Sequence, residues 1–173
     1  MACCSKETNM VSKYLYRFAS NNISNGASQA DGTVISDGVF EIDCVSYNPG
    51  EVTKLLQARL LSSALDASAG LEVSVRLHLF SINPTLSAGD SVEYGAGFSY
   101  LGYVDFTDYT TIAAPGGTPI SFGMSYGSFP SNWQGYFSPE SSTRMIYGVL
   151  QNKSGGAMDC TDKTFFVELI FEK

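Results

Sequence analysis

A strictly alternating stretch from Leu71 to Ile82 constrains the fold more than any other part of the sequence. It reads LEVSVRLHLFSI, with apolar side chains at every second position from Leu71 to Leu79 and polar ones between them. A β-strand projects successive side chains to opposite sides of its sheet, so this pattern is typical of a strand with one buried face. Pro84 has no N–H to donate to a sheet, so it ends the strand. We therefore expect a sheet with one buried face.

Other short segments carry strand signals of the same kind. Asp37-Gly38 suits a tight hairpin turn between the β-type segments 33–36 and 39–43. Residues 54–61 could form a short helix or a strand, and we favour a strand because a polar connection separates them from the strand at Leu71. Further alternating segments are 100–106, 145–150 and 165–171. Many short strands without a convincing helix predict an all-β sandwich or barrel.

The composition fits one folded domain. The chain has 173 residues, of which 44% are hydrophobic and 16% charged, and this balance argues against global disorder. The net charge is −7, and the ten Lys and Arg residues are scattered along the sequence. Nucleic acid would require a basic stripe that neutralises phosphates, and an anionic membrane would require a polybasic anchor. We expect neither nucleic acid nor a membrane as a partner.

The first residues and the cysteines indicate a reducing compartment. Residues 1–9 lack the apolar segment of a signal peptide, so we expect the protein to fold in a cytoplasm. The four cysteines lack the spacing of a metal site: Cys3 and Cys4 are adjacent, Cys44 and Cys160 are isolated, and the chain has one histidine. We therefore expect four free thiols, no metal and no cofactor.

Residues 1–32 read as an extended polar N-terminal arm, ahead of a single β-sandwich domain at 33–173. The arm is rich in Ser, Asn, Ala and Gly, and its apolar patch includes Tyr14, Tyr16 and Phe18. Such a segment buries too little surface to order itself, so either the domain or a neighbouring subunit must hold it. The three aromatic residues are therefore candidates for an interface.

Groups that could perform catalysis do not form a constellation. His78 is the single histidine and has no Ser or Cys at a spacing that indicates a nucleophile and its base, so we expect it to be solvated or hydrogen-bonded. Four carboxylates lie close together in sequence, at Asp90, Glu93, Asp105 and Asp108, but turns are rich in Asp for local reasons. We predict that the protein is not an enzyme.

An aromatic-rich stretch lies within a long predicted loop at 107–143. Between residues 122 and 137, rings recur without strand or helix spacing among Gly, Ser, Pro and Asn. Three interpretations are open: a plug over one end of the sandwich, a protein interface, and a carbohydrate platform. We favour the interface narrowly, with Trp133 as its anchor. The candidate interface residues are Tyr126, Phe129, Trp133, Tyr136 and Phe137.

Part of the sequence resembles a known family. The segments 58–61 (ARLL), 75–80 (VRLHLF), Pro84-Thr85, Gly89-Asp90 and 100–106 (YLGYVDF) occur in an order similar to that of head decoration, or cement, proteins of tailed bacteriophages. The likeness covers about residues 34–106. The aromatic stretch and the Cys3-Cys4 arm are not part of it.

This resemblance implies both a fold and a role. The fold would be a jelly-roll-like antiparallel β-sandwich, and the protein would be a structural component of the virion that stabilises the capsid lattice. Its partners would be the major capsid protein and neighbouring copies of itself, with a trimer at a local threefold axis as one arrangement. It would sit on the capsid surface after assembly in the host cytoplasm. The alternatives are a carbohydrate-binding β-sandwich module and a neck or tail component of the virion.

Overall fold

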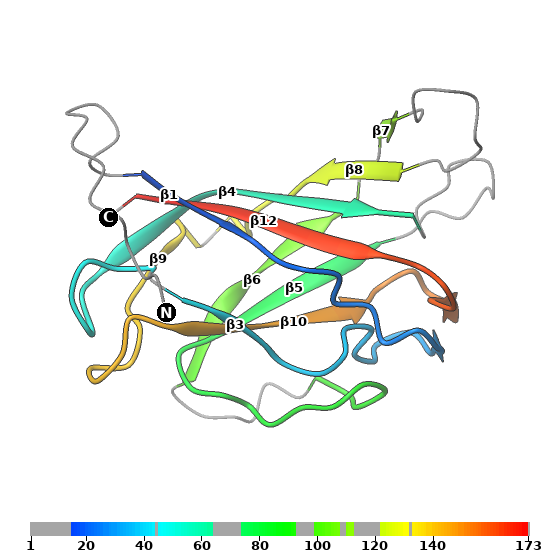
Figure 1. Cartoon of the computed structure of the whole chain (residues 1–173), viewed down its shortest axis with the longest axis horizontal. Coiled ribbons are helices and arrows are strands. Elements are labelled where there is room, and N and C mark those ends of the chain that lie inside the picture. Colours follow the sequence, from blue (N-terminus) through cyan, green and yellow to red (C-terminus); the bar gives the residue numbers. More distant parts are fainter. Residues whose placement is uncertain are drawn as a thin grey trace.

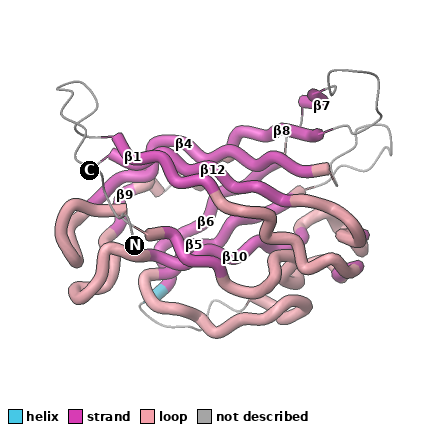
Figure 2. The backbone as a smooth tube through the Cα atoms, in the orientation of Figure 1, coloured by secondary structure: helices cyan, strands magenta, loops and turns pink. Residues whose placement is uncertain are grey.

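The computed structural model describes residues 15–43, 45–63, 74–92, 99–107, 110–112, 122–131 and 133–172, and these residues form two packed β-sheets (Figures 1 and 2). No α-helix occurs among them, and every strand pairing is antiparallel. The predicted all-β sandwich is confirmed. The upper sheet of Figure 1 contains β1 (Leu15–Ala19), β12 (Phe165–Glu172), β4 (Thr53–Ser62), β8 (Phe122–Tyr126), β7 (Thr110–Ile112) and β9 (Tyr136–Phe137). The lower sheet contains β3 (Phe40–Ile42), β10 (Ile146–Asn152), β5 (Val75–Phe80) and β6 (Tyr100–Phe106). A further short pair joins β2 (Ser28–Gln29) to β11 (Met158–Asp159).

The strand order identifies a jelly roll. The upper sheet runs β1-β12-β4-β8 before it reaches β7, and the lower sheet runs β3-β10-β5-β6. The first of these eight strands therefore pairs with the last, the second with the seventh, the third with the sixth and the fourth with the fifth. Such nested antiparallel pairing arises when one long hairpin is wound around itself, which is the jelly-roll topology.

Most strands lie where the alternation predicts them. Residues 54–61 form β4 and not a helix, and the segments 100–106, 145–150 and 165–171 correspond to β6, β10 and β12. The alternating stretch that begins at Leu71 corresponds to β5, which starts at Val75 in the described part of the chain. Leu71 and Val73 lie outside the described residues.

The hairpin predicted at Asp37-Gly38 does not form. Residues 33–36 and β3 both follow the same edge of β10: the backbone of Val34 bridges to Gln151, while Phe40 pairs with Gly148. The chain therefore continues in one direction through an interruption. Gly38 adopts a φ of 75° at that interruption, a conformation that glycine tolerates without strain.

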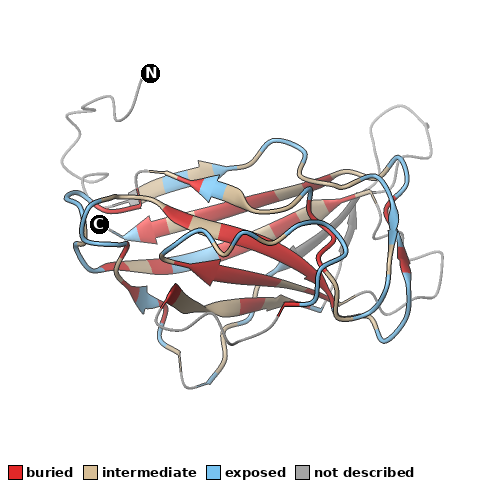
Figure 3. Ribbon diagram, turned by 90° about the horizontal axis from the view of Figure 1, so that it is seen from below, coloured by how far each residue is buried: buried red, intermediate tan, exposed pale blue. Residues whose placement is uncertain are grey.

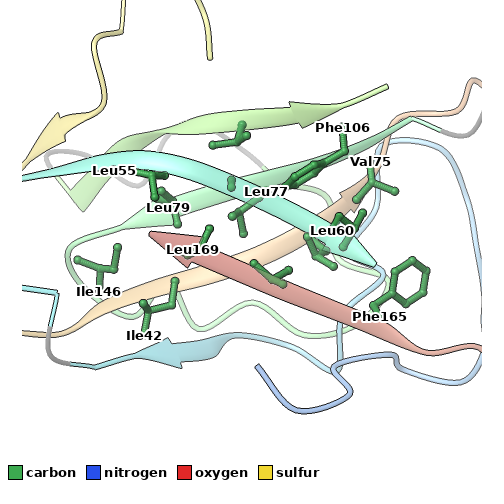
Figure 4. Packing of buried hydrophobic residues seen from close by; sticks show 14 of the residues in the cluster. Ile42, Leu55, Leu60, Val75, Leu77, Leu79, Phe106, Ile146, Phe165 and Leu169 are labelled. Atoms are coloured by element: carbon green, nitrogen blue, oxygen red, sulfur yellow. The ribbon is translucent and has the colours of Figure 1, made fainter. Parts of the chain in front are cut away.

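The main core fills the space between the two sheets (Figures 3 and 4). In β12, Phe165, Val167, Leu169 and Phe171 are buried, whereas the residues between them face the outer side of the upper sheet. β5 contributes Leu77 and Leu79 from below. The alternation in the sequence thus sets which side chains build the core.

The outer face of the lower sheet is also buried, so the expectation of one buried face for this sheet was wrong. Phe80 and Val149 point away from the main core and form a second cluster with Val34 and Val92. The segments 20–39 and 81–92, named here the covering segments, supply Val34, Val92 and Leu86 to this cluster. Periodicity within β5 could not reveal the cover, because it comes from distant parts of the chain.

Part of the predicted N-terminal arm belongs to the upper sheet. Residues Leu15–Ala19 form β1, which pairs along its length with β12. Tyr16 stacks on Phe171 at a ring separation of 6.3 Å, and Phe18 packs against the main core. The domain itself therefore holds this part of the arm.

The predicted loop 107–143 contains three strands, β7, β8 and β9. Both β8 and β9 pair with β4, so residues 127–135 interrupt what is otherwise one strand. This interruption crosses to the lower sheet, where Ser128 and Asp105 exchange backbone hydrogen bonds of 2.8 and 3.0 Å. Because of this insertion, the alternating pattern of these strands cannot be recognised in the sequence.

Candidate interaction surface

The outer face of the upper sheet, named here the upper face, is built by the strand register. In β12 the outward residues are Phe166, Glu168, Ile170 and Glu172, because their neighbours are buried. Arg59 of β4 is paired with Glu168, and Tyr126 of β8 is paired with Arg59. Side chains of paired residues lie on the same face of a sheet. The upper face therefore crosses four strands, with β1 on one side and β8 and β9 on the other.

An ion cluster occupies the middle of the upper face. Glu168 forms salt bridges with both Arg17 and Arg59. The Glu168 side chain is 11% exposed, whereas that of Arg17 is 66% exposed. Arg17 is therefore the part of the cluster that an incoming partner would meet first.

Exposed apolar side chains lie on the same face as this cluster, on β4, β8 and β9. Tyr126 is 56% exposed and Tyr136 is 53% exposed, both from strands that pair with β4. Leu56 is the extra residue of a β-bulge, because Phe171 pairs with Leu55 and Ile170 with Gln57. The bulge leaves Leu56 39% exposed. Tyrosine and arginine are among the residues enriched in binding hot spots.

The upper face and the covering segments differ in charge. The charged residues of the upper face are Arg17, Lys54, Arg59, Glu168 and Glu172, which leave one net positive charge. The covering segments contain three acidic residues and no Lys or Arg: Asp31, Asp37 and Asp90. Figure 1 shows segment 81–92 below the lower sheet, away from the upper face, whereas the first covering segment descends from the end of β1 toward β3. The covering segments are therefore acidic, whereas the upper face is close to neutral.

The predicted interface residues separate into exposed and packed groups. Tyr126 and Tyr136 are exposed on the upper face, whereas Phe137 is only 6% exposed and belongs to the main core. Phe129 and Trp133 pack against that core, with their rings edge to face at 5.5 Å, and Trp133 Nε1 donates to the Tyr136 carbonyl at 3.3 Å. This packing favours the plug interpretation for Trp133.

The remaining predicted candidates come from the N-terminal arm. Tyr16 and Phe18 are partly buried against the main core, and Tyr14 lies outside the described residues. The sequence reasoning missed Arg17, Arg59 and Glu168. The feature of the sequence that could have indicated them is Glu168 itself, a charged residue among the mostly apolar residues of β12.

His78 was expected to be either solvated or hydrogen-bonded. In the structure it is fully buried and hydrogen-bonded. Its Nδ1 lies 3.1 Å from the Tyr100 hydroxyl, and its Nε2 lies 3.0 Å from Gln151 Oε1. Burial lowers the pKa of His78 from 6.5 to about 4, so the ring is neutral at pH 7. Its two nitrogens thus face a phenol and an amide. The ring is part of a structural network and not of a nucleophile–base pair.

The other candidate groups for chemistry are also in structural contacts. Asp105 accepts two hydrogen bonds from Arg76, of 2.6 and 2.8 Å, and the Arg76 guanidinium lies 3.7 Å above the Tyr103 ring. Asp90 accepts from the backbone N–H of Ser87 at 2.8 Å. Glu93 and Asp108 lie outside the described residues. Within the described part of the chain, His, Cys, Asp and Glu form no cluster that could hold a metal ion.

Cys160 is a free, buried thiol. Burial raises its pKa to about 11, with a smaller contribution from Asp159, so it is neutral and unreactive at pH 7. Cys3, Cys4 and Cys44 lie outside the described residues. None of the described residues forms a helix long and apolar enough to cross a membrane.

No protein-family model matches the chain, and no curated protein matches it. Among solved structures, one that matches is the "Cryo-EM structure of Mud crab tombus-like virus at 3.3 Angstroms resolution". The match covers 98% of this chain and 92% of that chain, at 12% sequence identity and a TM-score of 0.28. A TM-score of this size does not establish a common fold, so the jelly-roll assignment rests on the strand order. The resemblance to phage decoration proteins stays a prediction.

Proposed function

We propose that this protein is a non-enzymatic structural component of a virus particle, a cement protein that binds the outer surface of the capsid. The observation that supports this role best is the jelly-roll strand order combined with an exposed, aromatic-rich upper face. Jelly rolls are a common architecture of viral capsid proteins. The resemblance to tailed-phage decoration proteins points to the same role and names the major capsid protein as the partner.

The upper face is the docking surface in this proposal. It presents Tyr126 and Tyr136 beside Arg17, whereas the covering segments present only negative charge to solvent. Binding through the upper face buries the apolar side chains and leaves the acidic side outward. Each copy then makes modest contacts with the lattice, and many copies together give a strong collective attachment. Contacts between neighbouring copies add to it.

A carbohydrate-binding module is the rival function, because lectins also use jelly rolls. Such a module stacks sugar rings on open aromatic faces. On the upper face, however, Lys54 Nζ lies 4.8 Å from the centre of the Tyr136 ring and covers one side of it. Tyr126 alone does not form an aromatic strip. This arrangement favours a protein partner.

A co-sedimentation experiment tests the proposal. Particles of the virus whose genome carries this coding sequence, prepared without the protein, are mixed with purified chain and pelleted. We expect saturable co-sedimentation, and we expect the double variant Tyr126→Ala/Tyr136→Ala to bind at least about 30-fold more weakly, since loss of even one hot-spot tyrosine costs about 2 kcal/mol or more. Tyr47→Ala is the matched control, because Tyr47 is 54% exposed and lies in the turn before β4.

Two outcomes contradict the proposal. Wild-type protein that stays in the supernatant excludes the particle as a partner. Wild-type protein that pellets while the double variant pellets equally well excludes the upper face as the docking surface. Binding of the isolated chain to glycans on an array, abolished in the Tyr126→Ala variant, would support the rival function.

A further inference from the structure

The strand β1 forms one edge of the upper sheet, and its outer side presents backbone groups to solvent (Figure 1). Ser20 N donates to the carbonyl of Val167, which lies directly across from it beside β12, at 2.9 Å. In an antiparallel ladder, residues that bond to the partner strand alternate with residues whose N–H and C=O groups point away. Phe18 therefore bonds to β12, whereas the backbone groups of Arg17 and Ala19 point outward. Within the described part of the chain, these outward groups have no backbone partner.

The β1 edge lacks the features that usually prevent a sheet edge from binding another strand. Such edges are commonly protected by proline, by a β-bulge or by charged side chains. β1 contains no proline, and its five residues pair with β12 in unbroken register. Its one charged residue, Arg17, is bound by Glu168 of β12, which holds the guanidinium over the sheet and away from the edge. Ala19 is exposed and small, so it forms no barrier to another strand.

The two edges of the lower sheet differ from β1 in this respect. At the β6 edge, Asp105 already exchanges backbone hydrogen bonds with Ser128, so part of that edge is occupied. The β3 edge is only three residues long, and its Glu41 is exposed. A short edge strand that carries a charge pairs poorly with another strand. Of these three edges, β1 is therefore the one best suited to bind a strand from outside.

We propose that β1 pairs antiparallel with β1 of a second copy of this chain, so that the upper sheets of the two copies join into one continuous sheet. The outward backbone groups determine the register: Arg17 exchanges N–H and C=O hydrogen bonds with the partner's Ala19, and Ala19 does so with the partner's Arg17. Phe18 then lies opposite the partner's Phe18, beside a two-fold axis. The pairing concerns the isolated chain and does not depend on the proposed particle role.

The side chains of β1 fit this register on both faces of the joined sheet. On the upper face, Arg17 lies opposite the small partner residue Ala19, whereas a register that placed arginine opposite arginine would be destabilised by like charges. On the inner face, Phe18 packs partly buried against the main core. A second Phe18 directly across from it forms an aromatic cross-strand pair and covers both rings further. A strand that is small opposite Arg17 and aromatic opposite Phe18 is β1 itself, so the occupant is a second copy.

The geometry of this pairing determines how the two copies face their surroundings. The two-fold axis of an antiparallel strand pair that continues a sheet is perpendicular to that sheet, so both upper faces point to the same side. A dimer would therefore attach to a lattice through two docking faces at once, a consequence that, unlike the dimer, rests on the proposed function. The joint is short, and small interfaces give weak, reversible complexes. We expect dissociation constants on the order of 100 µM for the isolated chain.

Sedimentation equilibrium of the full chain, at concentrations from about 5 to about 500 µM, tests the pairing. We expect a monomer–dimer equilibrium. Ala19→Pro should weaken the dimer at least about 10-fold, because it removes an outward N–H from each copy and leaves the bonds between β1 and β12 in place. Ala19→Lys should also weaken it, because the lysine lies opposite the partner's Arg17. Ala19→Ser keeps the N–H and the small side chain, so it should dimerise as the wild type does.

Amide hydrogen exchange of the wild type, followed residue by residue by NMR, gives a second readout that needs no variant. The amide protons of Arg17 and Ala19 should exchange rapidly in dilute protein and become protected as the concentration rises. The amide proton of Phe18, which bonds to β12, should be protected at every concentration.

Four results would overturn the proposal. The first is a wild type that stays monomeric over the whole range of concentration, and the second is a trimeric mass. The third is an Ala19→Pro variant that melts at the temperature of the wild type and dimerises equally well. The fourth is protection of the Arg17 and Ala19 amide protons in dilute, monomeric protein, which would show that residues of the same chain cover the edge.

Discussion

The ring of Trp133 lies against the backbone of Gly102, so that a Cβ atom at position 102 would come within 3.0 Å of ring atoms Cδ2 and Cε2. Gly102 belongs to β6 of the lower sheet, whereas Trp133 lies in the segment between β8 and β9 of the upper sheet. This contact and the Ser128–Asp105 pairing close one side of the sandwich. The glycine is needed both for the space and for its φ of 145°.

We therefore expect Gly102→Ala to destabilise the protein by about 1–3 kcal/mol, because the new methyl group displaces the indole and strains the backbone. Gly156→Ala is the control, since a Cβ atom at position 156 would meet no atom within 4 Å beyond its chain neighbours. Urea unfolding measures both variants. A Gly102→Ala protein as stable as wild type would show that the indole does not pack as described.

Glu168 holds two arginines on the upper face, so its replacement should be costly. We expect Glu168→Ala to lose about 2–4 kcal/mol, because it leaves the Arg59 guanidinium partly buried beside Arg17 without its carboxylate. Arg17→Ala should lose less than about 1 kcal/mol, since the Arg17 side chain is 66% exposed. Thermal unfolding at low and moderate salt compares them. Equal losses in the two variants would contradict the central role of Glu168.

Cys160 should resist alkylation in the folded protein. Its pKa is raised to about 11 and its side chain is buried, so almost no accessible thiolate exists at pH 8. Iodoacetamide labelling followed by mass spectrometry of the peptide that contains Cys160 checks this directly. We expect labelling in denaturant only, and rapid labelling of the native protein would show that the site opens.

Local alternation was enough to predict the main strands and the sandwich, because each inward residue of β12 or β5 reports on the same core. It could not predict the cover over His78, since burial of that ring depends on Gly32 and Gln151, which lie far away in sequence. Alternation also could not predict the structure of the aromatic stretch, because an insertion between Tyr126 and Tyr136 interrupts the alternating pattern. Trp133 thus looked like an exposed anchor, although its environment is set by Gly102 of the opposite sheet.

A cement role on the outer capsid surface has its sharpest test on particles from infected cells. Purified particles are treated with a protease that does not breach the shell, and the proteins left are quantified by mass spectrometry. We predict many copies of this chain per particle before treatment and selective loss of its peptides afterwards. Absence of the chain from purified particles, or its full protection inside the shell, would contradict the cement role.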